Sequence, residues 1–171
     1  SFVAGHSLGE YSALVASEVL SLSQAVPLVR LRAQAMQEAV AVGAGAMAAV
    51  LGLQAAQVVA ICAQAQSEFA PDSGEVVQAA NFNDPGQTVI SGSQPAVEKA
   101  CELLKAAGAK RTLLLPVSAP FHCAMMEPAA QRLRSHLADL SLGAPQIPVI
   151  NNIDVAQETD PARIRDALFR Q

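Results

Sequence analysis

A serine stands between two glycines in residues 5–9, which read G-H-S-L-G. The apolar residues 2–4 before it predict a short strand, and residues 10–14 after it predict the start of a helix. A strand, a sharp turn and a helix with a serine at the apex form a nucleophile elbow, in which glycines flank the serine because the strained turn leaves no room for side chains. We therefore predict that Ser7 is a nucleophile and that the Leu8 N–H, at a helix N-terminus, stabilises an oxyanion. The alternative is a plain strand-to-helix turn.

A serine nucleophile needs a base, and the sequence has three histidines. His6 directly precedes Ser7, so its side chain should point away from that of the serine. His136 lies among charged and polar residues of a predicted helix, as an ordinary solvated residue would. His122 follows a proline-containing segment at the end of a predicted strand, and loops at strand ends are where catalytic groups gather. We predict His122 as the base; the alternative is a loop histidine bonded to the backbone.

No acidic residue stands out as a third member of a catalytic triad. Asp154 and Asp160 are possible, but the first lies in a predicted turn and the second at a predicted helix N-cap. A backbone carbonyl could equally orient His122.

Two arginines of one predicted helix differ in their surroundings. Arg30 has polar neighbours one and two turns further along, whereas the positions three and four residues from Arg32 are apolar. A guanidinium on an apolar face is costly unless an anion meets it. Three alternatives follow for Arg32. It is paired with a carboxylate of this protein, or its side chain extends so that the guanidinium reaches water, or it is available to bind a substrate carboxylate in bidentate geometry.

Between residues 43 and 118 the pattern predicts strands and helices in the order β-α-β-β-α-β. The strands are expected at residues 47–53, 76–82, 88–91 and 111–117, and the helices at 54–69 and 94–107. This is the order of a ferredoxin-like subdomain, which we expect to be inserted into an α/β core formed by residues 1–42 and 119–171. In the core, further helices are expected at residues 21–40, 124–140 and 160–171, and a strand at 147–150.

The composition limits the class of protein. The 171 residues are 51% hydrophobic and 15% charged, which is typical of a globular chain, and no apolar run approaches the roughly 18 residues of a membrane span. The net charge of −4 argues against nucleic acid binding, which needs a basic surface. Three cysteines and three histidines without metal-ligand spacing predict reduced thiols, a cytoplasmic location and no metal site. Because the chain opens inside the elbow strand, we expect it to be part of a larger protein.

Several motifs together resemble the malonyl-CoA:acyl-carrier-protein transacylases of bacterial type II fatty acid synthesis, which are related to the acyltransferase domains of polyketide synthases. The motifs are G-H-S-L-G-E-Y at residues 5–11, Arg32, N-F-N-D-P-G-Q at 81–87, F-H-C at 121–123 and N-N-I-D at 151–154. The resemblance covers the whole chain. It implies an α/β fold with an α/β-hydrolase-like parallel-sheet core, truncated in this chain, and an inserted ferredoxin-like α+β subdomain.

The resemblance also implies roles for individual residues. Ser7 would be the nucleophile, His122 its base and Arg32 the clamp for the malonyl carboxylate. The Leu8 N–H would be one oxyanion donor. A carbonyl of Gln171 would orient His122, which would explain the missing acid.

Further substrate-binding positions follow from the same resemblance or from local charge. Asn81, Asn83 and Phe121 lie in the matching motifs, and Phe121 belongs to the form of the F-H motif associated with malonyl preference in the polyketide relatives. Lys110 and Arg111 lie just after a predicted helix and could form a basic patch for the acidic carrier protein or for coenzyme A. The alternative is a solvated helix end.

The reaction implied by the resemblance is ping-pong transfer of a malonyl group from malonyl-CoA to the phosphopantetheine thiol of acyl carrier protein. A monomer would catalyse it without a metal or redox cofactor, since the coenzyme A thioester is a substrate. A second oxyanion donor, upstream of Ser1, and a C-terminal segment would lie outside this chain. The alternatives are the acyltransferase of a polyketide pathway, a non-catalytic module, and a serine esterase or thioesterase, which would normally carry an acid and then a histidine after the elbow.

Overall fold

The computed structural model describes residues 1–171 and divides into two compact units. Unit 1 comprises Ser1–Ala35 and Pro128–Gln171, and unit 2 comprises Met36–Glu127. The segment that the sequence assigned to an inserted subdomain, residues 43–118, falls inside unit 2, which also includes the loop after it because that loop packs on the sheet of unit 2.

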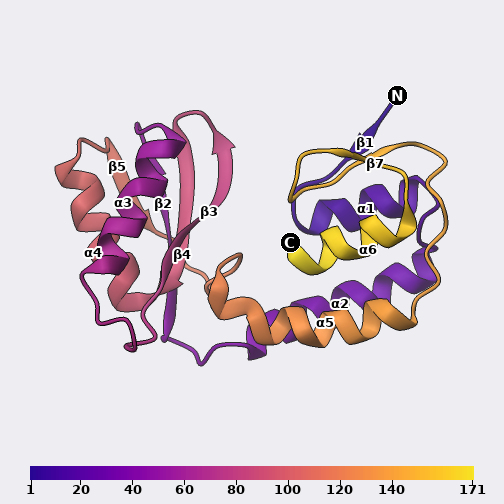
Figure 1. The fold of residues 1–171 in the computed structure, drawn as a ribbon, viewed down its shortest axis with the longest axis horizontal. Helices are drawn as coiled ribbons and strands as arrows, with labels where there is room; N and C mark the ends of the chain where they lie inside the picture. The colour runs from indigo at the N-terminus through magenta and orange to yellow at the C-terminus, as the bar shows by residue number, and fades with distance from the viewer. The chain divides into compact units, whose positions relative to one another are not determined.

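Unit 1 contains a small sheet and four helices (Figure 1). Its elements are β1 (Val3–Ala4), α1 (Leu8–Ala16), α2 (Leu22–Glu38), α5 (Glu127–Asp139), β6 (Val149–Ile150), β7 (Gln157–Glu158) and α6 (Pro161–Arg170). The strand order is β1-β6-β7, with β1 parallel to β6 and β6 antiparallel to β7. β1 therefore has the parallel neighbour that a strand entering an elbow requires. β7 was not expected, because a two-residue strand leaves no periodic pattern.

One apolar cluster holds unit 1 together. It joins the buried faces of all four helices to β6, through residues that include Leu14, Leu28, Leu137, Val149 and Leu168. Each of these side chains is at most 2% exposed, so the helices are fixed around the sheet by the burial of apolar surface.

Helix α2 begins where the sequence predicts. The Ser21 N–H donates to Gln24 Oε1 at 2.9 Å, and the Gln24 N–H donates to Ser21 Oγ at 3.2 Å. These two reciprocal hydrogen bonds form a capping box. The cap fixes the start of the helix that carries Arg32.

Unit 2 is a four-stranded antiparallel sheet with two helices. Its elements are β2 (Gly45–Leu51), α3 (Ala55–Ser67), β3 (Val77–Asp84), β4 (Gln87–Ser93), α4 (Gln94–Ala106), β5 (Arg111–Leu114) and the short 3-10 helix η1 (Ala124–Met126). The strand order is β3-β4-β2-β5, and the sequence of elements is the β-α-β-β-α-β order that the pattern predicts. Helices α3 and α4 pack on the sheet around a core that includes Val50, Val58, Ile90, Val97 and Leu104.

The three cysteines are free thiols, and no helix of the structure combines the length and the apolar content that a membrane span requires. Cys62 and Cys101 are buried in the core of unit 2, and Cys123 is half-buried. Burial raises the pKa of Cys62 to about 12, so this thiol is protonated at neutral pH.

Candidate functional site

Ser7 lies at the sharp turn between β1 and α1. Its φ of 52° is in the left-handed region, which a residue with a side chain rarely adopts. A strained residue of this kind persists only where the surrounding structure holds it. The backbone therefore has the elbow geometry expected from the sequence, with Leu8 as the first residue of α1 and its N–H outside the intrahelical hydrogen bonds.

The two glycines of the elbow differ in what they allow. A Cβ atom on Gly5 would collide with the backbone of Gly9 and Glu10, so β1 and α1 can approach this closely only with glycine there. A Cβ atom on Gly9 would meet nothing within 4 Å. The steric reason expected for both glycines therefore holds for Gly5 alone.

Asn152, which follows β6, holds the backbone of the elbow. The Ser7 N–H donates to Asn152 Oδ1 at 2.6 Å, and the Asn152 N–H donates to Glu10 Oε2 at 3.0 Å. Since β6 is the parallel neighbour of β1, the loop after it lies at the same sheet edge as the serine.

Arg32 and Ser7 are brought together by the fold of unit 1. Arg32 Nη2 donates to Ser7 Oγ at 2.9 Å and to Gln171 Oε1 at 3.1 Å, and the guanidinium carbon lies 5.5 Å from the centroid of the Tyr11 ring. Both hydrogen bonds go to neutral oxygens, from one of the three guanidinium nitrogens. The guanidinium thus has further N–H groups, on Nε and Nη1, with which to meet a carboxylate.

Glu10 is the functional candidate that reasoning from sequence missed. It is 1% exposed, and its Oε2 accepts a hydrogen bond from Gln171 Nε2 at 2.6 Å as well as the one from Asn152. Burial raises the pKa of Glu10, while the hydrogen bonds from Asn152 and Gln171 and the charge of Arg32 oppose the rise. The only signal in the sequence was an acid in the first turn of a helix, which is ordinarily a partner of the helix dipole.

The two aspartates considered as triad members have other partners. Asp154 forms a bidentate ion pair with Arg170, with oxygen–nitrogen distances of 2.8 and 2.6 Å. Asp160 caps α6, since its Oδ1 accepts a hydrogen bond from the Ala162 N–H at 2.9 Å. Asp154 does lie in a turn and Asp160 is an N-cap, as their sequence setting suggests, but the ion pair with Arg170 was not expected.

His122 belongs to unit 2, in the loop before η1, and it too has a left-handed φ, 60°. The loop is anchored on both sides of it. Before His122, Pro120 packs on Gly45 of β2 so closely that a Cβ atom on Gly45 would collide with the proline ring. The Sγ of Cys123, the residue after His122, donates a hydrogen bond to Pro120 O at 3.2 Å. After it, the Ala124 N–H donates to Gln78 Oε1 at 2.8 Å.

The remaining predicted positions also lie in unit 2. Phe121 is half-buried beside His122, and Asn81 is half-buried at a bulge of β3. Asn83 is exposed near the end of β3, and Lys110 and Arg111 are exposed at the start of β5.

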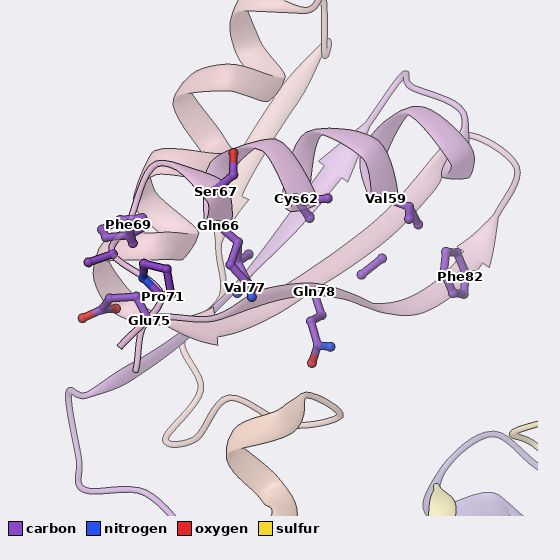
Figure 2. Close-up of a pocket in the computed structure, with 13 residues that line it drawn as sticks. Val59, Cys62, Gln66, Ser67, Phe69, Pro71, Glu75, Val77, Gln78 and Phe82 are labelled. Carbon is purple, nitrogen blue, oxygen red and sulfur yellow. Dashed lines mark hydrogen bonds between the residues drawn. The ribbon is translucent and has the colours of Figure 1, made fainter. Parts of the chain in front are cut away.

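A separate open pocket of about 730 Å³ lies in unit 2 between α3 and the edge strand β3 (Figure 2). Its lining includes Val59, Cys62, Phe69, Val77 and Phe82. Figure 2 shows Gln78 pointing away from α3, toward the side of the sheet on which it meets the loop of His122. No predicted site residue lines this pocket.

Comparison with known proteins decides the family, because the family model of the acyl transferase domain matches residues 1–167 of this chain. The chain belongs to the acyl transferase domain family. The chain is 53% identical over 169 residues to the malonyl CoA-acyl carrier protein transacylase of Salmonella typhimurium, and this alignment covers 99% of the chain and 53% of that protein. It therefore spans about half the length of the curated relatives that it matches.

Solved structures of similar proteins share the fold of the acyl transferase domain. The crystal structure of acyl-carrier-protein S-malonyltransferase from Burkholderia pseudomallei matches with a TM-score of 0.93 and 56% identity, over 99% of this chain and 53% of that one. A malonyl-transacylase solved in complex with a type II PKS acyl-carrier protein matches with a TM-score of 0.93 and 49% identity, over 99% and 53% of the two chains. The resemblance stated from the sequence motifs is thus confirmed at the level of the family.

Proposed function

We propose that the protein containing this chain transfers a malonyl group from malonyl-CoA to the phosphopantetheine thiol of acyl carrier protein through an ester on Ser7. The observation that carries the proposal is the position of Arg32, whose Nη2 lies 2.9 Å from the hydroxyl of a serine on a strained elbow. A fixed cation beside an acyl-accepting serine suits an acyl group that carries a carboxylate. The names of the relatives support the same substrate.

The reaction would proceed in two half-reactions. In the first, His122 takes the Ser7 proton as Ser7 Oγ attacks the thioester carbonyl, and the tetrahedral intermediate expels the coenzyme A thiolate, which takes up the proton. In the second, the carrier-protein thiol gives its proton to His122 and attacks the Ser7 ester, and Ser7 leaves with that proton. The Leu8 N–H would stabilise the oxyanion in both steps.

Other residues would support these steps. A carbonyl of Gln171 would orient His122, and Phe121, Asn81 and Asn83 would contact the substrate. The reaction needs no metal or redox cofactor. We further propose a monomeric enzyme in the cytoplasm, for which the three free thiols are supporting evidence.

The architecture proposed for the whole protein is an α/β-hydrolase-like parallel-sheet core with an inserted ferredoxin-like subdomain. The parallel pairing of β1 with β6 at the elbow supports the first part. The antiparallel sheet of unit 2, in the order β3-β4-β2-β5, supports the second.

A polyketide pathway is the second candidate, because one similar structure is a malonyl-transacylase with a type II PKS acyl-carrier protein. The chemistry at Ser7 and Arg32 would be the same, and only the carrier protein would differ. A serine esterase or thioesterase is less well supported, since a cation hydrogen-bonded to the nucleophile does not suit an uncharged acyl group.

The proposed function is tested by incubating the complete protein that contains these residues with radiolabelled malonyl-CoA and then with carrier protein. We expect label on the protein in the first step and its transfer to the carrier thiol in the second. Hydrolysis of the ester without transfer would indicate an esterase. Absence of label from the protein would indicate a non-catalytic module.

We expect His122→Ala to slow both half-reactions by roughly 10²–10⁴-fold, which is the usual contribution of a general base. His136→Ala, on the exposed face of α5, is the matched control and should leave both rates unchanged. Rapid-quench measurement of acyl-enzyme formation and decay gives the two rates separately. An unchanged rate in His122→Ala would exclude this histidine as the base.

We expect Lys110→Glu/Arg111→Glu to raise the apparent KM for carrier protein or coenzyme A, with little change in acyl-enzyme chemistry. The chain has a net charge of −4, so an acidic partner must be attracted by a local group of exposed basic residues. Steady-state kinetics at low and moderate salt measure the effect, which should weaken as salt rises. Arg163→Glu, an exposed charge reversal on α6, is the control. Wild-type KM values in the double variant would remove this patch from the docking site.

A further inference from the structure

We propose that Glu10 is a positioning residue for acyl transfer: its Oε2 anchors Asn152 and Gln171, and these two side chains in turn hold the backbone of Ser7 and the guanidinium of Arg32. The inference rests on the proposed function, because the positions of Ser7 and Arg32 matter to catalysis only if an acyl group is transferred between them.

The first branch of this arrangement runs through Asn152. Glu10 Oε2 accepts the Asn152 N–H at 3.0 Å, and Asn152 Oδ1 accepts the Ser7 N–H at 2.6 Å. The φ of Ser7, 52°, is unfavourable for a serine, so the elbow needs contacts that hold it in place. Asn152 is such a contact, and Glu10 fixes Asn152.

The second branch runs through Gln171. Gln171 Nε2 donates to Glu10 Oε2 at 2.6 Å, while Gln171 Oε1 accepts from Arg32 Nη2 at 3.1 Å. The same nitrogen of Arg32 donates to Ser7 Oγ at 2.9 Å. The amide of Gln171 therefore links Glu10 to the cation that would meet the malonyl carboxylate, and it restricts the direction in which the guanidinium faces.

A glutamate suits this position because an ionised carboxylate is only an acceptor, and one of its oxygens can receive both donors. Packing alone would not favour it. Glu10 is 1% exposed beside the apolar core of unit 1, where a hydrocarbon side chain would be buried at lower cost. Burial raises its pKa accordingly. The carboxyl group is thus buried for its contacts rather than for its volume.

The experiment measures kcat/KM for malonyl-CoA and acetyl-CoA in the complete protein and in its variants, with active sites titrated. We expect Glu10→Ala to lower the malonyl-to-acetyl ratio about tenfold, because Arg32 loses its anchored partner. Glu10→Gln should keep the ratio near the wild-type value, since its amide oxygen can accept both hydrogen bonds. It should nevertheless lower Tm, because its NH₂ group would occupy the buried Oε1 position, which has no hydrogen-bond partner.

Two further variants separate positioning from stability. The ratio is measured per active site, so a smaller folded fraction does not change it. Gln171→Ala should lower the ratio as Glu10→Ala does, and the double variant should lose no more than either single variant, since Glu10 acts on Arg32 through Gln171. Asp139→Ala, an exposed acid at the end of α5, is the control and should leave the ratio unchanged.

An unchanged ratio in Glu10→Ala, or additive losses in the double variant, would overturn the proposal. If Glu10→Ala does not fold, Glu10→Gln and Gln171→Ala decide: loss of selectivity in the first or its retention in the second overturns the proposal. Failure of the wild-type protein to form a malonyl ester would refute the proposed function and this inference with it. A wild-type protein that transfers malonyl while Glu10→Ala keeps its selectivity would refute the inference alone.

Discussion

Arg32→Ala is expected to abolish most malonyl transfer while acetyl transfer is kept or improved. If the malonyl carboxylate pairs with Arg32 in a site shielded from water, removing the cation should cost roughly 3–5 kcal/mol, as for other buried ion pairs that lose one partner. This corresponds to a fall in kcat/KM of about 10²–10³-fold or more. An acetyl group makes no such pair, and it would no longer share its pocket with a cation.

The structure makes this test specific to the substrate. Arg32 donates a hydrogen bond to the hydroxyl of Ser7, so removing the arginine changes the surroundings of the nucleophile as well as the substrate contact. Acetyl-CoA reports the first effect and malonyl-CoA reports both. Arg30→Ala, on the exposed side of the same helix, is the matched control and should change neither value. Equal losses with both substrates would mean that Arg32 supports Ser7 or the fold rather than binding the carboxylate.

Ser7→Ala is expected to abolish formation of the acyl-enzyme. No other hydroxyl lies on the elbow, and the reaction proposed here has a covalent ester as its obligatory intermediate. Intact-mass measurement after incubation with malonyl-CoA gives the result directly, as the presence or absence of a malonyl adduct.

Ser12→Ala is the matched control for this experiment. Ser12 is exposed on α1, one turn beyond the elbow, and its variant should form the adduct as the wild-type protein does. A stable malonyl ester on Ser7→Ala would place the nucleophile elsewhere and remove the elbow from the mechanism.

The ends of the predicted strands and helices show where local sequence patterns are sufficient to predict the structure. The strand expected at residues 111–117 ends at Leu114, because Pro116 has no N–H with which to continue a ladder. Helix α4 ends near Gly108, whose φ of 96° only glycine adopts without strain. Caps and breakers act over a few residues, so these boundaries are predictable to within a few positions.

The site shows where local patterns fail. The apolar neighbours of Arg32 indicated that its charge needs a partner, but they could not choose between a carboxylate of the protein, water and a substrate. The partners observed, Ser7 and Gln171, are separated from it by 25 and 139 residues. Contacts over such separations depend on how helices pack, and periodicity carries no information about them.

The sequence by itself determined the elbow, the order of elements in unit 2 and the family, because each of these depends on residues close together in the chain or on motifs in a fixed order. Only the tertiary structure decided that Glu10, Asn152, Gln171 and Arg32 meet around Ser7. Packing α1 against α6 and the loop after β6 buries Glu10, and a buried carboxylate must collect hydrogen-bond donors from whichever segments surround it. Glu10 lies next to the elbow in the sequence, but its burial and its hydrogen-bond partners come from segments more than 140 residues away, which no local pattern could predict.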